Sequence, residues 1–147
     1  MKKVNRIGFF KNIREIREYQ FGTFYFFDNL IIGEVNEGIT FDWEMGKKVI
    51  DASKEIFGDH LPIAYISNRI NNYQVVPTAW AKFFKNRHQL DVYCVVGNTK
   101  GSFASLVLER MFFKKTIKQF TNLEVAVEWC LLRIREIRVG KNSSVIY

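Results

Sequence analysis

A polar segment directly after an apolar, strand-like run holds the side chains best suited to binding chemistry. The run Pro62–Ile66 leads into Ser67, Asn68 and Arg69, and a polar loop continues to Pro77. A guanidinium recognises phosphate and carboxylate groups in a two-pronged geometry, and hydroxyl and amide groups add directed hydrogen bonds. We therefore predict a partner or ligand surface formed by Ser67, Asn68, Arg69, Asn71, Asn72 and Tyr73, with Lys100 from a later turn.

Lys100 lies in residues 97–102, Gly-Asn-Thr-Lys-Gly-Ser, which superficially resemble a phosphate-binding loop. A Walker loop has four residues between its glycines and a lysine directly after the second glycine. Here the gap is three residues and the lysine lies within it, so the motif fails. Two alternatives stay open: Lys100 and free backbone N–H groups hold an anion at the next helix start, or this is an ordinary strand-to-helix turn.

The remaining reactive side chains form no catalytic or metal-binding signature. His60 and His88 fall in predicted turns away from a nucleophile, and no G-x-S-x-G sequence occurs. Cys94 and Cys130 lack histidine neighbours in sequence and fall on an apolar strand and an apolar helix face, which indicates buried free thiols. We expect a non-enzymatic, cytoplasmic protein without cofactor or metal.

The elements that must position the polar loop alternate between strand and helix from about Gly22 onward. Thr23–Phe27 and Leu30–Val35 predict a hairpin, followed by a helix that Thr40 or Asp42 caps and Gly58 ends. The next strand, Leu61–Ile66, completes a βαβ unit, whose strands are normally parallel. The prediction is a single small α/β domain with a mostly parallel, mixed sheet of four to five strands, an N-terminal hairpin and helices packed on the sheet.

The second half of the chain continues this alternation. We expect a short helix opening at Pro77 and Thr78, a strand over Val92–Val96, a helix over residues 103–113 and an edge strand over Thr116–Phe120. Pairing of that edge strand with a second copy would make a homodimer. The sequence Thr121-x-x-Glu124 predicts a capping box, and the helix after it has one apolar face: Leu123, Ala126, Val127, Cys130, Leu131 and Ile134.

The domain boundaries follow from the same pattern. Residues 1–19 are predicted to form a basic arm, loosely held over Met1–Asn12 and undecided between strand and helix over Ile13–Gln20. Residues 20–139 form the domain, and residues 140–147 form a patternless tail that frays.

The net charge of +7 does not by itself indicate nucleic-acid binding. Residues 1–18 carry six basic side chains against two acidic ones, so much of the excess lies at the chain end, and no recognition motif interleaves basic and aromatic residues. The longest apolar stretches are strand-sized, far below the roughly 20 residues of a membrane span. We expect another protein as the partner, rather than nucleic acid or a membrane.

The order of these elements resembles the SpoIIAA-like group of the STAS superfamily, related to bacterial anti-sigma-factor antagonists. The resemblance covers roughly residues 20–135 and is carried by Leu30–Gly38 leading into the helix at Asp42, by Ile63–Arg69, by Val92–Gly97 and by Glu124–Trp129. It implies a non-catalytic regulatory or protein-interaction module. Since relatives include phosphorylated antagonists, it also implies candidate phosphorylation at Ser67 or Thr78, although Arg69–Tyr73 replace the usual Asp-Ser switch motif.

A carrier of a small anionic or lipid-like ligand is the alternative. Aromatic residues surround the polar loop, and they either line an apolar cleft or fill the core beneath it: Tyr73, Trp80, Phe83, Phe84 and Phe103. For an interaction module, an Arg69→Ala variant is expected to keep its fold and lose its partner.

Overall fold

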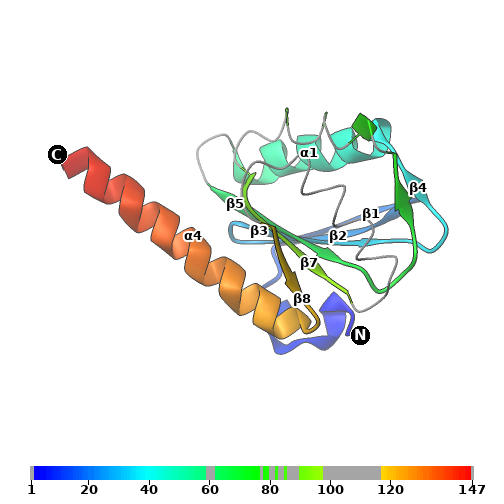
Figure 1. Ribbon diagram of the computed structural model, residues 1–147, viewed down its shortest axis with the longest axis horizontal. Helices are drawn as coiled ribbons and strands as arrows, with labels where there is room; N and C mark the ends of the chain where they lie inside the picture. Colours follow the sequence, from blue (N-terminus) through cyan, green and yellow to red (C-terminus); the bar gives the residue numbers. More distant parts are fainter. Residues whose placement is uncertain are drawn as a thin grey trace.

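A six-stranded mixed sheet runs through the centre of the computed structural model (Figure 1). The structure describes residues 2–58, 62–76, 78, 79, 82, 85, 90–97 and 117–146, with side chains up to residue 140. The strands are β1 (Glu15–Tyr19), β2 (Gly22–Phe27), β3 (Leu30–Val35), β5 (Ile63–Asn68), β7 (Leu90–Val96) and β8 (Ile117–Phe120). Their spatial order is β1-β2-β3-β5-β7-β8, so the prediction of four to five strands was too low.

The sheet combines an antiparallel hairpin region with a parallel half, as predicted. β1, β2 and β3 pair antiparallel, whereas β3, β5, β7 and β8 pair parallel. Asn29 has φ 60°, a left-handed conformation that asparagine tolerates in two-residue hairpin turns. The segment left undecided, Ile13–Gln20, contains β1, and its alternating burial fits an edge strand. β8 forms the opposite edge, as predicted.

Helix α1 (Trp43–Phe57) connects β3 to β5 and has the predicted boundaries. The Asp42 carboxylate caps it by accepting a hydrogen bond from the Met45 backbone N–H at 3.0 Å. Gly58 follows the helix with φ 73°, a conformation that glycine adopts without a Cβ clash.

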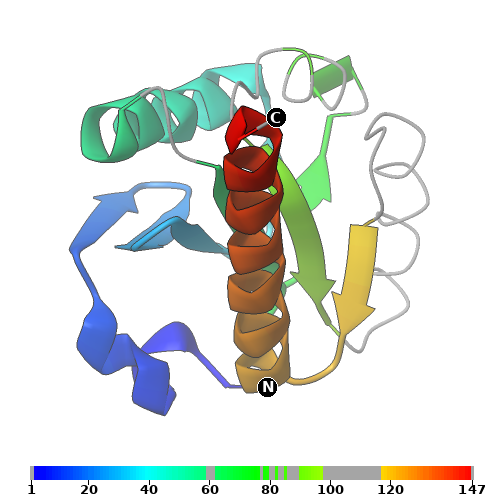
Figure 2. The ribbon, with the colours of Figure 1, turned by 90° about the vertical axis from the view of Figure 1, so that its left-hand side faces the viewer.

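The two faces of the sheet are covered by different helices, α1 and α4 (Leu123–Ile146), as Figures 1 and 2 show. Because side chains alternate along a strand, neighbouring strand residues enter different cores. In β3, Ile31 packs on the α1 side and Ile32 packs on the α4 side. The α4 side contains the predicted helical stripe, of which Leu123, Ala126, Val127, Cys130 and Ile134 are buried.

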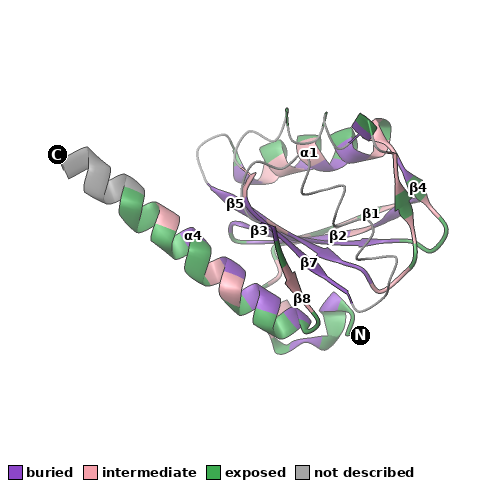
Figure 3. Ribbon diagram, viewed as in Figure 1, coloured by how far each residue is buried: buried purple, intermediate pink, exposed green. Residues whose placement is uncertain are grey.

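Both ends of α4 differ from the prediction. Asn122, not Thr121, caps the helix, because its side-chain oxygen accepts from the Val125 backbone N–H at 3.1 Å. Residues 140–146 continue the helix to Ile146 and do not form a patternless tail. Figure 3 shows buried segments near the start of α4 and exposed segments toward its far end.

The N-terminal segment is held firmly, so the prediction of a loose arm over residues 1–12 is wrong. It forms two short 3₁₀ helices, η1 (Val4–Arg6) and η2 (Gly8–Asn12), on the α4 side of the sheet. Val4 is fully buried and Ile7 nearly so, and Lys2 pairs with Glu124 of α4 at 2.7 Å. Since β1 also belongs to the main sheet, no structural boundary separates residues 2–19 from the rest.

Cys94 of β7 and Cys130 of α4 are buried free thiols, as predicted. Their sulfur atoms face each other at 3.5 Å across the helix–sheet interface. The helix predicted over residues 103–113 lies outside the described residues, as do His60, His88, Trp80, Phe83, Phe84 and Phe103.

Replacement of Gly33 by alanine is expected to destabilise the fold. An added Cβ would lie 2.8 Å from Cε1 of buried Phe24 and would collide with the hydroxyl of Tyr65. Overpacking of this kind lowers the free energy of unfolding by about 1–3 kcal/mol, measured by urea denaturation. Gly8→Ala is the control, because nothing lies within 4 Å of its added Cβ. Equal stability of the two variants would contradict this packing.

Candidate functional site

The loops that follow β3 and β5 are joined to each other at the carboxyl edge of the parallel strands. A two-stranded parallel sheet forms between β4 (Thr40–Phe41) and β6 (Gln74–Val75). Next to it, the Gly38 N–H donates to the Asn72 carbonyl at 2.8 Å, and the Asn72 N–H donates to the Glu37 carboxylate at 2.6 Å. The Asn71 side chain donates to the Val35 carbonyl at 3.0 Å. The polar loop is therefore an ordered structure laid over the sheet edge.

Arg69 is the buried centre of this edge, with only 5% of its surface exposed. Its Nε–H donates to the Ser67 hydroxyl at 3.0 Å, and its guanidinium lies 5.6 Å from the centre of the Tyr73 ring. The Ser67 and Tyr73 hydroxyl groups are themselves 2.9 Å apart. The Arg69 backbone N–H donates to the Val96 carbonyl at 2.8 Å, which ties the loop to β7 as well.

Two further tyrosines complete the surroundings of the guanidinium. Tyr65 and Tyr93 come from adjacent strands and stack with ring centres 5.6 Å apart, and Tyr93 hydrogen bonds to Arg69. Burial alone would lower the pKa of Arg69, but the tyrosines, Tyr73 first, raise it above its ordinary value. Arg69 therefore keeps its positive charge inside the protein and organises a cluster of hydroxyl groups and aromatic rings.

A second polar cluster lies at the same edge, on the α4 face of the sheet. The buried Glu34 carboxylate accepts from the Val4 backbone N–H at 2.9 Å and from the Asn68 side-chain amide at 2.8 Å. Asn68 also donates to the Lys2 carbonyl at 3.0 Å. This cluster attaches the N-terminal segment to the ends of β3 and β5.

Burial is the main influence on the ionisation of this second cluster. It raises the pKa of Glu34 above its ordinary 4.5, against the lowering effect of the hydrogen bonds from Val4 and Asn68. Burial, followed by the nearby charge of Glu34, raises the pKa of Tyr25 to about 12. Within the described part of the chain, the Asn68 side-chain oxygen is buried without a hydrogen-bond partner.

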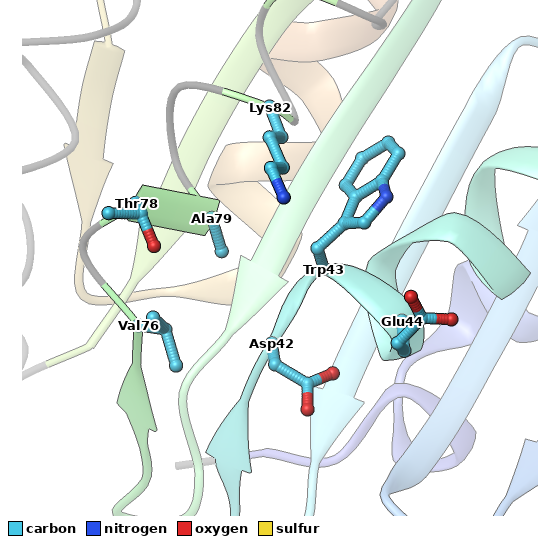
Figure 4. Close-up of a pocket in the computed structure, with 7 residues that line it drawn as sticks. All are labelled: Asp42, Trp43, Glu44, Val76, Thr78, Ala79 and Lys82. Atoms are coloured by element: carbon cyan, nitrogen blue, oxygen red, sulfur yellow. The ribbon is translucent and has the colours of Figure 1, made fainter.

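A shallow pocket of about 220 Å³ lies beside the joined loops. In Figure 4, Thr78, Ala79 and Lys82 lie on one side and Asp42, Trp43 and Glu44 on the other. Val76 completes the lining. Two carboxylates against one amine make this pocket a poor match for an anion.

The predicted surface residues are thus divided by the structure. Ser67, Asn68 and Arg69 are buried, Asn71 and Tyr73 are half-buried, and Asn72 and Thr78 are exposed. Ser67 and Arg69 lie together on the α1 face, whereas Asn68 points to the other face and joins Glu34. Lys100 lies outside the described residues.

Sequence reasoning missed Glu34, for which the sequence holds a signal, and also Tyr65 and Tyr93, for which it holds none. Glu34 is the one charged residue in the otherwise apolar strand β3, and a carboxylate inside such a run needs partners when buried. Tyr65 and Tyr93 occupy paired positions on adjacent parallel strands, and that register follows only from the folded sheet.

In the described ranges, no group of His, Cys, Asp and Glu side chains is arranged to hold a metal ion. No described helix combines the length and apolarity that crossing a bilayer requires.

Arg69→Ala is now expected to destabilise the protein, which corrects the expectation that it leaves the fold intact. The substitution removes the donor to Ser67 and the cation beside Tyr73 from a buried site. A loss of about 2–3 kcal/mol in the free energy of unfolding follows for a buried charged hydrogen-bonding group. Arg69→Lys is expected to recover only part of this loss, because it lacks the Nε–H and the planar guanidinium. Urea denaturation measures both, with exposed Asn72→Ala as control; equal midpoints for all would refute the role of Arg69.

The raised pKa of Glu34 predicts a pH-dependent stability. The folded chain holds the Glu34 proton more tightly than the unfolded chain, so this group contributes most below pH 4.5 and loses its contribution as pH rises through the folded pKa. The Glu34→Gln side chain cannot ionise, so the variant does not lose this stability as the pH rises. Its side-chain oxygen still accepts a hydrogen bond from Val4 or Asn68. Relative to wild type, E34Q should therefore gain stability between pH 4 and pH 8 in urea denaturation series.

Glu18→Gln is the matched control, because it replaces an exposed carboxylate of β1. If the stability difference for E34Q changes with pH no more than that for E18Q, burial of Glu34 does not control the pH dependence.

No protein-family model, no curated protein and no solved structure matches this chain. The resemblance to the SpoIIAA-like group stays a prediction from the order of its elements, and what the structure adds is the mixed α/β sheet and the polar clusters at its carboxyl edge.

Proposed function

We propose that this chain is a non-catalytic regulatory or protein-interaction module of the STAS, SpoIIAA-like type. Its contact surface is the rim of the carboxyl edge, formed by exposed Glu37, Asn72, Gln74 and Thr78. The observation that carries the proposal is the fixation of this rim by the buried Arg69 cluster and by the β4–β6 pairing. A rim that is already ordered loses little conformational freedom on binding a protein.

Thr78 is the better candidate for regulation by phosphorylation. Thr78 is exposed and lines the pocket together with Lys82. The Ser67 hydroxyl is buried and already bonded to Arg69 and Tyr73, so a kinase reaches it only after the edge opens. A phosphate on Thr78 would place negative charge on the proposed contact surface.

A carrier of an anionic or lipid-like ligand is less favoured by the same residues. The Arg69 guanidinium is engaged inside the cluster, and the described pocket has Asp42 and Glu44 in its lining. Native mass spectrometry of protein from its own cells tests this alternative directly, because a carrier retains extra organic mass that is lost on denaturation.

A charge placed on the rim is expected to abolish partner binding. Immobilised wild-type protein, Asn72→Arg and Asn12→Arg are incubated with lysate of the source cells, and bound proteins are quantified by mass spectrometry. Asn12 is the control because it is an exposed asparagine in η2, outside the rim. We expect a protein that wild type and N12R retain and that N72R loses by about tenfold or more, a typical cost for a central contact.

Circular dichroism is needed to show that both variants keep the fold. Retention of the same proteins by folded N72R would refute the rim as the contact surface. Thr78→Glu, which imitates the phosphate charge, should reduce capture of the same protein.

A further inference from the structure

The outer face of α4 carries an apolar stripe directly opposite its buried face. Val125, Leu132 and Val139 are 48%, 54% and 59% exposed. They recur every seven residues, which places them on one line of a helix. At 3.6 residues per turn, Leu132 lies about 200° around the helix from buried Cys130. The domain therefore covers one side of α4 and leaves the apolar stripe to solvent.

We propose that this stripe forms a symmetric dimer, in which α4 of a second copy packs antiparallel against it with Leu132 on the two-fold axis. In that register Leu132 meets Leu132 of the second copy, and Val125 meets Val139 of the second copy. The interface is closed, because each copy offers and receives the same patch. The sheet lies behind α4 in both copies, so it leaves the contact open.

Two charged side chains beside the stripe select a second copy as the occupant. Glu128 and Arg135 are exposed on the same flank of the stripe, four residues before Leu132 and three residues after it. In the antiparallel register Glu128 lies about 1.5 Å along the helix axis from the level of Arg135 of the second copy. The two-fold axis generates the same pair a second time, between Arg135 and Glu128 of the second copy, so two ion pairs border the apolar contact.

The other charges of this face are already used within the chain. Glu124 pairs with Lys2 at 2.7 Å, and Glu136 pairs with Arg133 at 2.6 Å. Across the ranges that the structure describes, Glu128 and Arg135 have no ion-pair partner in their own chain. Among the described residues, the two charges that the dimer requires are therefore ones without an ion-pair partner inside the chain.

The same charges disfavour a parallel arrangement. In a parallel pair the two-fold axis runs along the helices and places the flanks that carry Glu128 and Arg135 on opposite sides of the contact. Glu128 then does not meet Arg135 of the second copy, and neither ion pair forms. The contact from Val125 to Val139 spans about 21 Å of helix, so the interface is small and the expected dimer is weak.

Engineered cysteines test the register. Val125→Cys and Val139→Cys are made separately and then oxidised with diamide, alone and as a mixture, at about 100 μM, where a micromolar dissociation constant gives mostly dimer. The antiparallel register predicts a disulfide-linked dimer in the mixture and little from either variant alone. Cys94 and Cys130 are buried and do not compete.

Two results of this experiment would overturn the proposal. Cross-linking of V125C with itself indicates a parallel pair, and the absence of a cross-link in the mixture indicates that the stripe does not meet its copy. A dimer that forms through the β8 edge would also leave the mixture without a cross-link, and it would overturn the proposal in the same way.

Charge reversal and sedimentation velocity test the surface without new thiols. Glu128→Arg and Arg135→Glu should each shift the protein from dimer to monomer, and the double variant should restore the dimer. Leu132→Glu should also give monomer, whereas Ile16→Glu should stay dimeric, because Ile16 is an exposed apolar residue on β1. A monomeric wild type, or a dimer that L132E leaves intact, would refute the proposal. These variants lie outside the rim, so their outcome is independent of partner capture.

Discussion

The buried guanidinium of Arg69 is the interaction on which the carboxyl edge of this protein depends. It hydrogen bonds to Ser67 and lies beside Tyr73, while its backbone reaches Val96 of β7. A charge in this position requires satisfied partners, since burial of an unpaired charge is costly. The residues with the most obvious binding chemistry in the sequence therefore serve first to fix the loop that carries them.

The opposite face of the same edge solves a related problem with a carboxylate. Glu34 accepts from Val4 and Asn68, and Asn68 reaches Lys2, so the N-terminal segment is held by buried polar bonds as well as by Val4 and Ile7. Consecutive residues Ser67 and Asn68 thus belong to different clusters, because strand alternation sends them to opposite faces. One strand end organises both sides of the sheet.

Local patterns predicted the elements of this fold well. The hairpin at Asn29, the Asp42 cap, the stop at Gly58 and the buried stripe of α4 all depend on neighbours in sequence, where propensity and periodicity carry the information. Besides the strand count and the cap of α4, the errors were at the chain ends, because the first twelve residues and the last turns of α4 have weak patterns. Contacts with the sheet hold the former, since Val4 and Ile7 enter the α4-side core.

The α/β class, the order of β2, β3, α1, β5, β7, β8 and α4, and the polar character of the segment after β5 follow from the sequence alone. Which residues of that segment are accessible depends on the folded arrangement of the strands and loops. Arg69 has near partners in Ser67 and Tyr73, but it also contacts Tyr93 and Val96 of β7. Glu34 binds Val4 and Asn68, which are distant in the chain, and these contacts depend on how the parallel strands align. Burial is a property of that three-dimensional arrangement, so a sequence rich in binding side chains does not reveal which of them face a partner.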